Sequence, residues 1–245
     1  MLKTKLNSRK MNTRIRMLTL LVCLFISSCN RNDDSYAING KNGIALSDII
    51  AFSGISSTMV NADSFSTASI SVQLSPQTDS ANRYVIFKTT LGQFANHDSI
   101  ITVFANSNGA ALTTLYGTIP GTTIINAYVG TISIDTIIQF TPALPDNMLL
   151  SADKYVVDST DSIHVSSQLF RNNGRVSNGT FVYFTTSRGN NADSLIIPGF
   201  GISQNGSVNA ILINPFISRG NFTVTAWTIS TSNDTLRKSF NVLIK

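Results

Sequence analysis

The sequence repeats itself, with two similar segments about one hundred residues apart. Residues 85–92 (VIFKTTLG) correspond to residues 182–189 (VYFTTSRG), and the Asn-Gly pair at 108–109 recurs at 205–206. One unit of a solenoid is only about 20–45 residues long, so a period of this length suits a whole domain. The repeat therefore predicts two copies of one domain.

Within each copy, apolar and polar residues alternate with a period of two, as in a half-buried strand. Residues 69–74 (SISVQL) alternate in this way, and Trp227 falls on the face opposite Phe222, Val224 and Ala226. Turn-forming residues separate such runs: Ser75-Pro76, Asn108-Gly109, Pro120-Gly121, Asn172-Asn173-Gly174 and Asn205-Gly206. Short alternating strands between frequent turns predict an all-β chain of two tandem immunoglobulin-like β-sandwiches, following a signal peptide and a flexible tether.

The N-terminal segment has the pattern of a secretory signal. Residues 1–16 contain six Lys and Arg and no acidic residue, and residues 17–26 (MLTLLVCLFI) are an apolar run. A helix of this length cannot span a hydrocarbon core of about 30 Å. We therefore expect a signal peptide over residues 1–28.

Residues 26–29 (ISSC) end this apolar run and resemble the lipobox of bacterial lipoproteins. The resemblance implies that Cys29 is lipidated, becomes the first residue of the mature chain and anchors it to a membrane. Cys23 would leave with the signal, and a single free thiol would be unusual in an oxidising compartment. The alternative is an ordinary cleaved signal followed by an incidental Cys.

Residues 29–44 are polar and predict a flexible tether after the lipidated N-terminus. Asp33 and Asp34 resemble the acidic export signal that directs Bacteroidota lipoproteins to the outer face of the outer membrane. The alternative is a plain solvated linker. We expect a lipid-anchored protein of the outer membrane that is either surface-exposed or periplasm-facing.

The net charge of +5 belongs to the signal segment rather than to the mature chain. From Cys29 onward, 12 Lys and Arg face 13 Asp, and the chain contains no Glu. A basic excess would otherwise point to nucleic acid, so this partner is not expected.

A family resemblance is carried by residues 61–72 (NADSFSTASISV), which are similar to the opening of the bacterial immunoglobulin-like domains of invasin and intimin type. Residues 87–92 (FKTTLG), 108–111 (NGAA) and the pair Gly121 and Ala127 follow in the order of that family. The resemblance covers most of residues 45–141, whereas the second copy lacks the Ala-Asp-Ser opening. It implies a spacer or an adhesive module at a cell surface.

The expected organisation follows from these observations. We expect a first domain over residues 45–141, a proline-containing linker over 142–146 and a second domain over 147–245.

Residues that could support catalysis or metal binding are sparse. The two His, His97 and His164, lie at unrelated positions, and no nucleophile elbow, phosphate-binding loop or dinucleotide fingerprint is present. Asp153, Asp158 and Asp161 could offer oxygen ligands to Ca²⁺, but turns and strand starts explain them better. We therefore expect no enzyme activity, no catalytic residue, no cofactor and no metal site.

Asp followed by Ser or Thr and then a small or apolar residue occurs repeatedly, and this triplet resembles the O-glycosylation sequon of exported Bacteroidota proteins. The alternative is a local turn just before a strand, which Asp-Ser and Asp-Thr also favour. The candidate acceptors are Ser80, Ser99, Thr136, Ser159, Ser162, Ser194 and Thr235.

Trp227 and its counterpart Tyr128 are the candidate residues for stacking against a ligand. By alternation both point away from the core, and a repeated structural role on the outer face is the favoured interpretation. The leading functional hypothesis is a non-catalytic adhesion or interaction module with a surface protein or a glycan as ligand. The alternatives are a carbohydrate-binding accessory lipoprotein of a glycan-uptake system and a structural spacer or assembly subunit.

Overall fold

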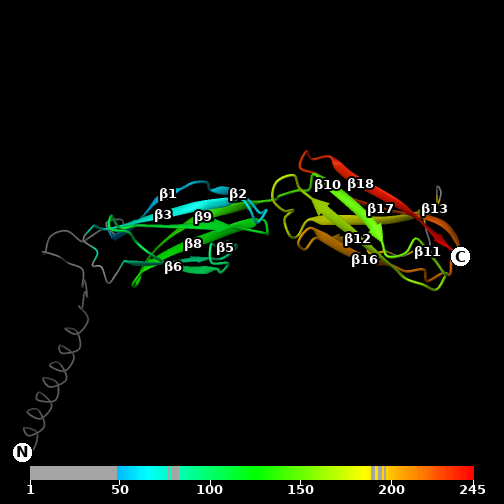
Figure 1. Cartoon of the computed structure of the whole chain (residues 1–245), viewed down its shortest axis with the longest axis horizontal. Coiled ribbons are helices and arrows are strands. Elements are labelled where there is room, and N and C mark those ends of the chain that lie inside the picture. Colours follow the sequence, from blue (N-terminus) through cyan, green and yellow to red (C-terminus); the bar gives the residue numbers. More distant parts are fainter. Residues whose placement is uncertain (1–48, 77, 79–82, 189–190, 193–194, 196) are drawn as a thin grey trace, which may run out of the picture. The chain divides into compact units, whose positions relative to one another are not determined.

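The computed structural model describes residues 49–76, 78, 83–188, 191–192, 195 and 197–245. These residues form eighteen β-strands, β1 to β18, which pair into four sheets (Figure 1). Among them, strands before residue 142 pair only with one another, and so do strands after residue 146. The predicted all-β class is confirmed.

The first sandwich packs a four-stranded sheet A against a five-stranded sheet B. Sheet A has the order β1-β3-β7-β5, and sheet B has the order β2-β9-β8-β4-β6. The strands are β1 (Ile50–Ile55), β2 (Met59–Asn61), β3 (Thr67–Leu74), β4 (Tyr84–Thr89), β5 (Gln93–Phe94), β6 (Ile100–Phe104), β7 (Ala110–Tyr116), β8 (Gly121–Val129) and β9 (Ile132–Thr141).

The second sandwich packs a three-stranded sheet C against a six-stranded sheet D. Sheet C has the order β10-β12-β16, and sheet D has the order β11-β18-β17-β13-β14 with β15 also paired to β13. The strands are β10 (Asn147–Ala152), β11 (Val156–Val157), β12 (Ile163–Phe170), β13 (Phe181–Arg188), β14 (Asn191–Ala192), β15 (Phe200–Ile202), β16 (Ser207–Leu212), β17 (Gly220–Ile229) and β18 (Thr235–Ile244).

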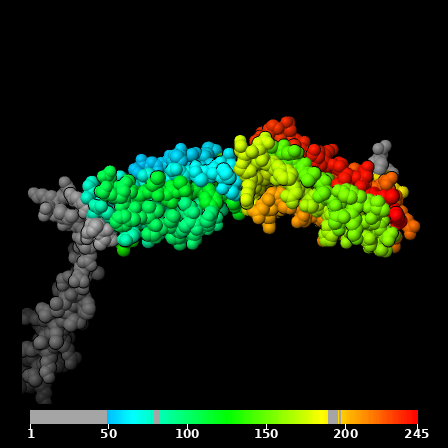
Figure 2. All heavy atoms as spheres, viewed as in Figure 1, coloured from blue at the N-terminus to red at the C-terminus, as the bar shows by residue number. Residues whose placement is uncertain are grey.

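Each sandwich has its own apolar core, formed by the inward faces of its two sheets. Figure 2 draws all heavy atoms in the same view, and no gap between the two sheets of a sandwich is open on this face. The alternating residues Ile70, Val72 and Leu74 are buried, as the period of two predicts. Phe87 lies opposite Ala127 in sheet B, and Phe184 lies opposite Ala226 in sheet D. The repeat in the sequence is therefore a repeat of strand register.

The two Asn-Gly pairs of the repeat form different turns. Asn205 and Gly206 both have positive φ, 51° and 77°, and they join Gln204 to Ser207 in a two-residue hairpin. Of the pair Asn108-Gly109 in the first sandwich, only Gly109 has a positive φ, because Asn106 Oδ1 accepts the N–H groups of Asn108 and Ala110 and shapes a longer turn.

Asp63, in the opening that resembles the invasin family, closes a tight turn between β2 and β3. Its Oδ1 accepts the N–H groups of Phe65 at 2.9 Å and Ser66 at 2.6 Å, and its Oδ2 accepts the Ser66 hydroxyl at 2.9 Å. The carboxylate is buried, and Ser64 between these residues has a φ of 65°. The side chain thus holds a strained backbone in place.

The described residues belong to one compact unit, and the segment between β12 and β13 contacts the first sandwich and the linker. The Ser177 hydroxyl donates to the carbonyl of Ala62 and accepts the N–H of Ala143, both at 2.8 Å. The N–H of Arg175 donates to the carbonyl of Asp63 at 3.0 Å. Ser177 is buried, so these bonds satisfy polar groups that water does not reach.

The short strands near the start of each sandwich pair in parallel with its last strand. β2 pairs with β9, placing Met59 opposite Gln139, and β11 pairs with β18, placing Val156 opposite Leu243. In the first sandwich β1 belongs to sheet A and β2 to sheet B, so the chain changes sheets between them.

Candidate functional site

The outer face of sheet D carries a group of apolar side chains that the core does not use. We call this group the aromatic patch: Phe181, Tyr183, Phe200, Ile202, Trp227 and Ile229. Phe181 is 47 % exposed and Phe200 is 53 % exposed. Exposed apolar patches of this kind mark interaction surfaces more often than isolated exposed residues do.

Strand register brings the members of the patch together. Tyr183 on β13 lies opposite Phe200 on β15 and opposite Trp227 on β17, and Trp227 lies opposite Arg237 on β18. Cross-strand partners share a face of the sheet. These four side chains therefore form one row across sheet D, with three aromatic rings followed by a cation.

The rings of the patch contact one another. Tyr183 and Trp227 are stacked with centroids 4.2 Å apart and an interplanar angle of 16°. Phe181 lies 6.3 Å from Tyr183 and 5.6 Å from Phe200. Because Tyr183 covers one face of the indole, only the other face of Trp227 is open to a ligand. The prediction that Trp227 lies on the outer face agrees with this position, and its role in stacking on a ligand stays a prediction.

A hollow of about 280 Å³ adjoins the patch. Its apolar lining consists of Pro120, Pro142, Leu144, Phe181, Tyr183 and Ile229. The two threonine hydroxyls in its wall are engaged, since Thr180 donates to the carbonyl of Ser177 and Thr228 donates to the carbonyl of Phe181, whereas the Tyr183 hydroxyl has no hydrogen-bond partner among the described residues. No charged side chain lines the hollow. It therefore suits an apolar group better than a polar one.

Sequence reasoning selected Trp227 but missed Phe181, Tyr183 and Phe200. The sequence carried a signal for one of them, Tyr183. Tyr183 directly precedes Phe184, and Trp227 directly follows Ala226, in segments that each have a counterpart in the first copy. Strand pairing of Phe184 with Ala226 then places Tyr183 beside Trp227.

The corresponding outer face of sheet B is also partly apolar. Tyr128 is half-buried there and lies opposite Ile86. It makes no ring contact within the described part of the chain, whereas Tyr84 and Phe104 meet edge to face at 5.0 Å. Tyr128 as a ligand-stacking residue stays a prediction without an aromatic neighbour to support it.

Comparison with known proteins gives structural matches only. No known family model matches the sequence, and no curated protein matches it. The adhesin InvE of Yersinia pseudotuberculosis matches with a TM-score of 0.54 and 18 % identity, over 82 % of this chain and 60 % of that one. Invasin, described as a bacterial integrin-binding protein, matches with the same TM-score and identity, over 80 % of this chain and 39 % of that one.

These matches decide the fold. The described chain is a tandem of immunoglobulin-like β-sandwiches. The resemblance of residues 61–72 to the invasin and intimin type agrees with this finding at the level of fold. The chain spans less than two thirds of the length of either matched structure.

The candidate glycosylation sites differ in accessibility. Ser99, Ser162 and Thr235 are exposed, Thr136 is partly exposed, and Ser80 and Ser194 lie outside the described residues. Ser159 is buried, because the segment after β16 covers it and Asn214 Nδ2 donates to its carbonyl at 3.0 Å. The candidate acceptor Ser159 is therefore not accessible in this structure. Modification itself stays a prediction.

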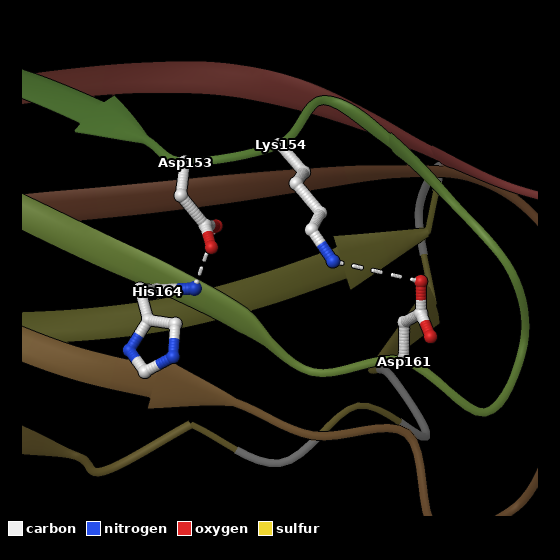
Figure 3. Close-up of polar contacts among 4 residues, drawn as sticks. All are labelled: Asp153, Lys154, Asp161 and His164. Carbon is white, nitrogen blue, oxygen red and sulfur yellow. Dashed lines mark hydrogen bonds and ion pairs between the residues drawn. The ribbon is translucent and has the colours of Figure 1, made fainter.

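Two of the three Asp side chains considered for Ca²⁺ are engaged elsewhere (Figure 3). Asp153 Oδ1 accepts the backbone N–H of His164 at 2.8 Å, and Lys154 lies 3.8 Å from Asp161. The imidazole of His164 points away from Asp153 in Figure 3, and Asp158 accepts the N–H of Asp161 through its carbonyl. In the ranges that the structure describes, no three His, Cys or Asp side chains gather as a metal site.

His97 takes part in a local contact rather than a catalytic arrangement. Its Nδ1 lies 2.6 Å from the Tyr116 hydroxyl, which donates to Gln93 at 3.1 Å. The partners in this contact are a phenol and an amide, and no carboxylate is among them.

The proposed anchor lies outside the part of the chain that the structure describes. This applies to Cys29, to residues 1–28 and to the tether over residues 29–44. Within the described residues, none forms a helix with the length and apolar character needed to cross a bilayer.

Asp146 in the linker ties residues 142–146 to the second sandwich. The N–H of Asn172 and the hydroxyl of Thr231 donate to its carboxylate at 2.7 Å and 2.6 Å. The Asn172 hydrogen bond, then the Thr231 hydrogen bond and the charge of Arg171, lower the pKa of Asp146 below its ordinary value. Because the pKa of Asp146 is lower in the folded protein than in the unfolded chain, its ionised carboxylate stabilises the fold at pH values above the unfolded pKa. This stabilisation is lost as the pH falls through the pKa of the folded state.

We expect Asp146→Asn to abolish part of the acid sensitivity of the protein. The wild type should be more stable than the variant at neutral pH, and the difference should shrink as the pH falls below about 4. Thermal melting between neutral pH and acid measures this difference. Asp135→Asn, which removes a carboxylate without a side-chain hydrogen bond to a described residue, is the matched control. A difference that stays constant with pH would contradict the prediction.

Proposed function

We propose that the chain is a non-catalytic interaction module of the bacterial cell envelope, anchored in the outer membrane by a lipid on Cys29. The module consists of domains over residues 45–141 and 147–245, joined by the linker 142–146 and carried on the tether 29–44. In this proposal its ligands are macromolecules, and it needs no cofactor.

The aromatic patch is the observation that carries the proposal. An exposed cluster of aromatic rings beside a cation has the composition of an interface centre, in which Trp, Tyr and Arg are enriched. The described Asp and His side chains, by contrast, are occupied in turns or ion pairs, or lie apart from one another. The structural match to an adhesin and to an integrin-binding protein supports an interaction role.

Protease treatment of intact cells, followed by mass spectrometry of released peptides, tests the proposed location. We expect peptides from both domains to be released while the outer membrane is intact. Some of these peptides would carry glycan on Ser99, Ser162 or Thr235 if the triplets are modified.

Metabolic labelling with a fatty acid analogue tests the anchor separately. The label should be present on the wild type and absent from a Cys29→Ser variant. Release only after rupture of the outer membrane would contradict surface exposure and favour the periplasm-facing form, an assembly or scaffold subunit. An unlabelled wild type would contradict the lipid anchor.

Carbohydrate binding is the second candidate function, and the position of Trp227 within the aromatic patch favours it. Sugar rings stack on exposed aromatic faces, and the open face of Trp227 adjoins Arg237. A glycan array with the wild type and Trp227→Ala tests this function. Binding that is lost in the variant would support it, and an array without any signal would count against it.

A further inference from the structure

We propose that the aromatic patch binds a second copy of this chain and that two sheets D pack face to face in a symmetric dimer. This inference deepens the proposed function by naming a partner for the same face. It rests on that function only in treating the patch as an interaction surface, and not on the anchor or the cellular location.

The size of the patch suits a weak dimer. A fully enclosed aromatic side chain buries about 150–250 Å², so six partly exposed apolar residues offer on the order of 500 Å² per copy. Two copies would then bury about 1,000 Å², which is the lower limit for a specific interface. An interface of this size belongs to the weak or transient class.

The row across sheet D is complementary to itself. It runs from Phe200 through Tyr183 and Trp227 to Arg237, so one end is aromatic and the other end is cationic. A two-fold axis parallel to the strands, placed at the middle of the row, sets Arg237 of each copy over Phe200 of the other. A guanidinium over an aromatic ring is attractive, and Arg is the cation most often found there.

Arg237 is available for this contact. Its side chain is exposed, and it forms no hydrogen bond or ion pair with a described residue. An exposed guanidinium at the edge of an apolar patch is free to lie over an aromatic face that a partner supplies. In the symmetric arrangement that partner is the patch of the second copy.

The symmetry also suits two chains held at one surface. An axis parallel to the strands leaves the strands of both copies running in the same direction, so corresponding ends of the two second sandwiches lie on the same side. The alternative axis, perpendicular to the strands, would place Phe200 over Phe200 and Arg237 over Arg237. This second arrangement brings like charges together, and it is disfavoured.

The chemistry of the patch and the hollow favours a protein face over a sugar. Tyr183 covers one face of Trp227, and the hydroxyls of Thr180 and Thr228 are already donated within the chain. Among the described residues, the Tyr183 hydroxyl and the Arg237 guanidinium are the polar groups left for a sugar there, so a sugar would replace fewer hydrogen bonds than it loses to water. An apolar side chain loses none.

Sedimentation velocity of the purified full chain tests the proposal, at concentrations on the order of 1 µM to 1 mM, which bracket a weak interface. We expect a reversible rise of the sedimentation coefficient with concentration. Trp227 is the single Trp of the chain, so its fluorescence reports on the patch directly. Its emission should shift to shorter wavelength as the dimer forms, because the indole then leaves water.

Two charged variants separate the patch from apolar surface in general. Phe200→Asp places a charge on sheet D, and Phe104→Asp places one on sheet B at an equally exposed aromatic residue of 55 % exposure. We expect Phe200→Asp to weaken association at least about tenfold, whereas Phe104→Asp should associate as the wild type does. Arg237→Glu, at an exposed position, should also weaken association. Circular dichroism verifies that each variant is folded.

Three results would overturn the proposal. The first is a wild type that stays monomeric over the whole concentration range. The second is a folded Phe200→Asp variant that associates as strongly as the wild type. The third is a monomer whose Trp227 emission responds to a soluble glycan, which would assign the patch to that ligand. None of these results bears on protease release from intact cells, so failure of the dimer and failure of the proposed location are distinguishable.

Discussion

Replacing Gly92 by alanine is expected to destabilise the first sandwich by about 4 kcal/mol, the combined cost of a left-handed backbone and an overfilled core. Gly92 has a φ of 86°, a backbone angle that residues other than Gly rarely adopt. A Cβ at this position would lie 2.6 Å from the carbonyl oxygen of Tyr116 and 2.8 Å from the ring of Phe140. The carbonyl belongs to β7, so it cannot move without disturbing sheet A.

Thermal and urea unfolding followed by far-ultraviolet circular dichroism measures this loss. Gly54→Ala is the matched control, because Gly54 has no positive φ and no atom within 4 Å of the added Cβ. We expect the control to change the free energy of unfolding by less than about 0.5 kcal/mol. Equal losses in the two variants would contradict the argument from sterics at Gly92.

Asp63→Ala is expected to destabilise the protein by about 3 kcal/mol, because it removes the acceptor of three hydrogen bonds to a buried carboxylate. The N–H groups of Phe65 and Ser66 would lose their partner, and the positive φ of Ser64 would no longer be held. The Asp63 carbonyl also accepts the N–H of Arg175, so a relaxed turn would weaken the contact with the second sandwich.

Asp63→Asn distinguishes the hydrogen bonds from the charge. Asn keeps an acceptor oxygen for the two N–H groups, and its amide can donate to the Ser66 hydroxyl, so we expect a loss of less than half that of the alanine variant. The measurement is equilibrium unfolding in urea. If Asn and Ala destabilise equally, the hydrogen-bond account is wrong and the negative charge itself matters.

Local sequence pattern predicts much of the fold. The period of two identifies which side chains are buried, as Ile70 and Phe222 illustrate, and the repeat predicts that Phe87 and Phe184 have the same environment. These properties depend on neighbours along the chain. The alternation of side chains along a strand is enough to assign each of them to one face of the sheet.

The aromatic patch could not be predicted in the same way. Alternation places Trp227 on the outer face, but it does not state which strand lies beside β17. The contact with Tyr183 depends on the register of β13 against β17, and Phe200 joins only because β15 pairs with β13. Such pairings are set by the whole sandwich, so they are absent from any single segment of the sequence.

The burial of Ser159 has a similar cause. The Asp-Ser-Thr triplet predicts a turn before a strand, and Ser159 does lie in the segment between β11 and β12. Its accessibility is decided by the distant segment after β16, from which Asn214 reaches the carbonyl of Ser159. A local motif carries no information about such a cover.

The parallel pairing of β2 with β9, and of β11 with β18, has a mechanical consequence. The two strands of each pair lie near opposite ends of their sandwich in the sequence and run in the same direction. A force that stretches the chain slides one strand along the other, so all hydrogen bonds of the pair bear the load together. In a hairpin opened from one end, the bonds would break one after another. Tension between β2 and β9, or between β11 and β18, is therefore shared across the pair rather than borne by one hydrogen bond at a time.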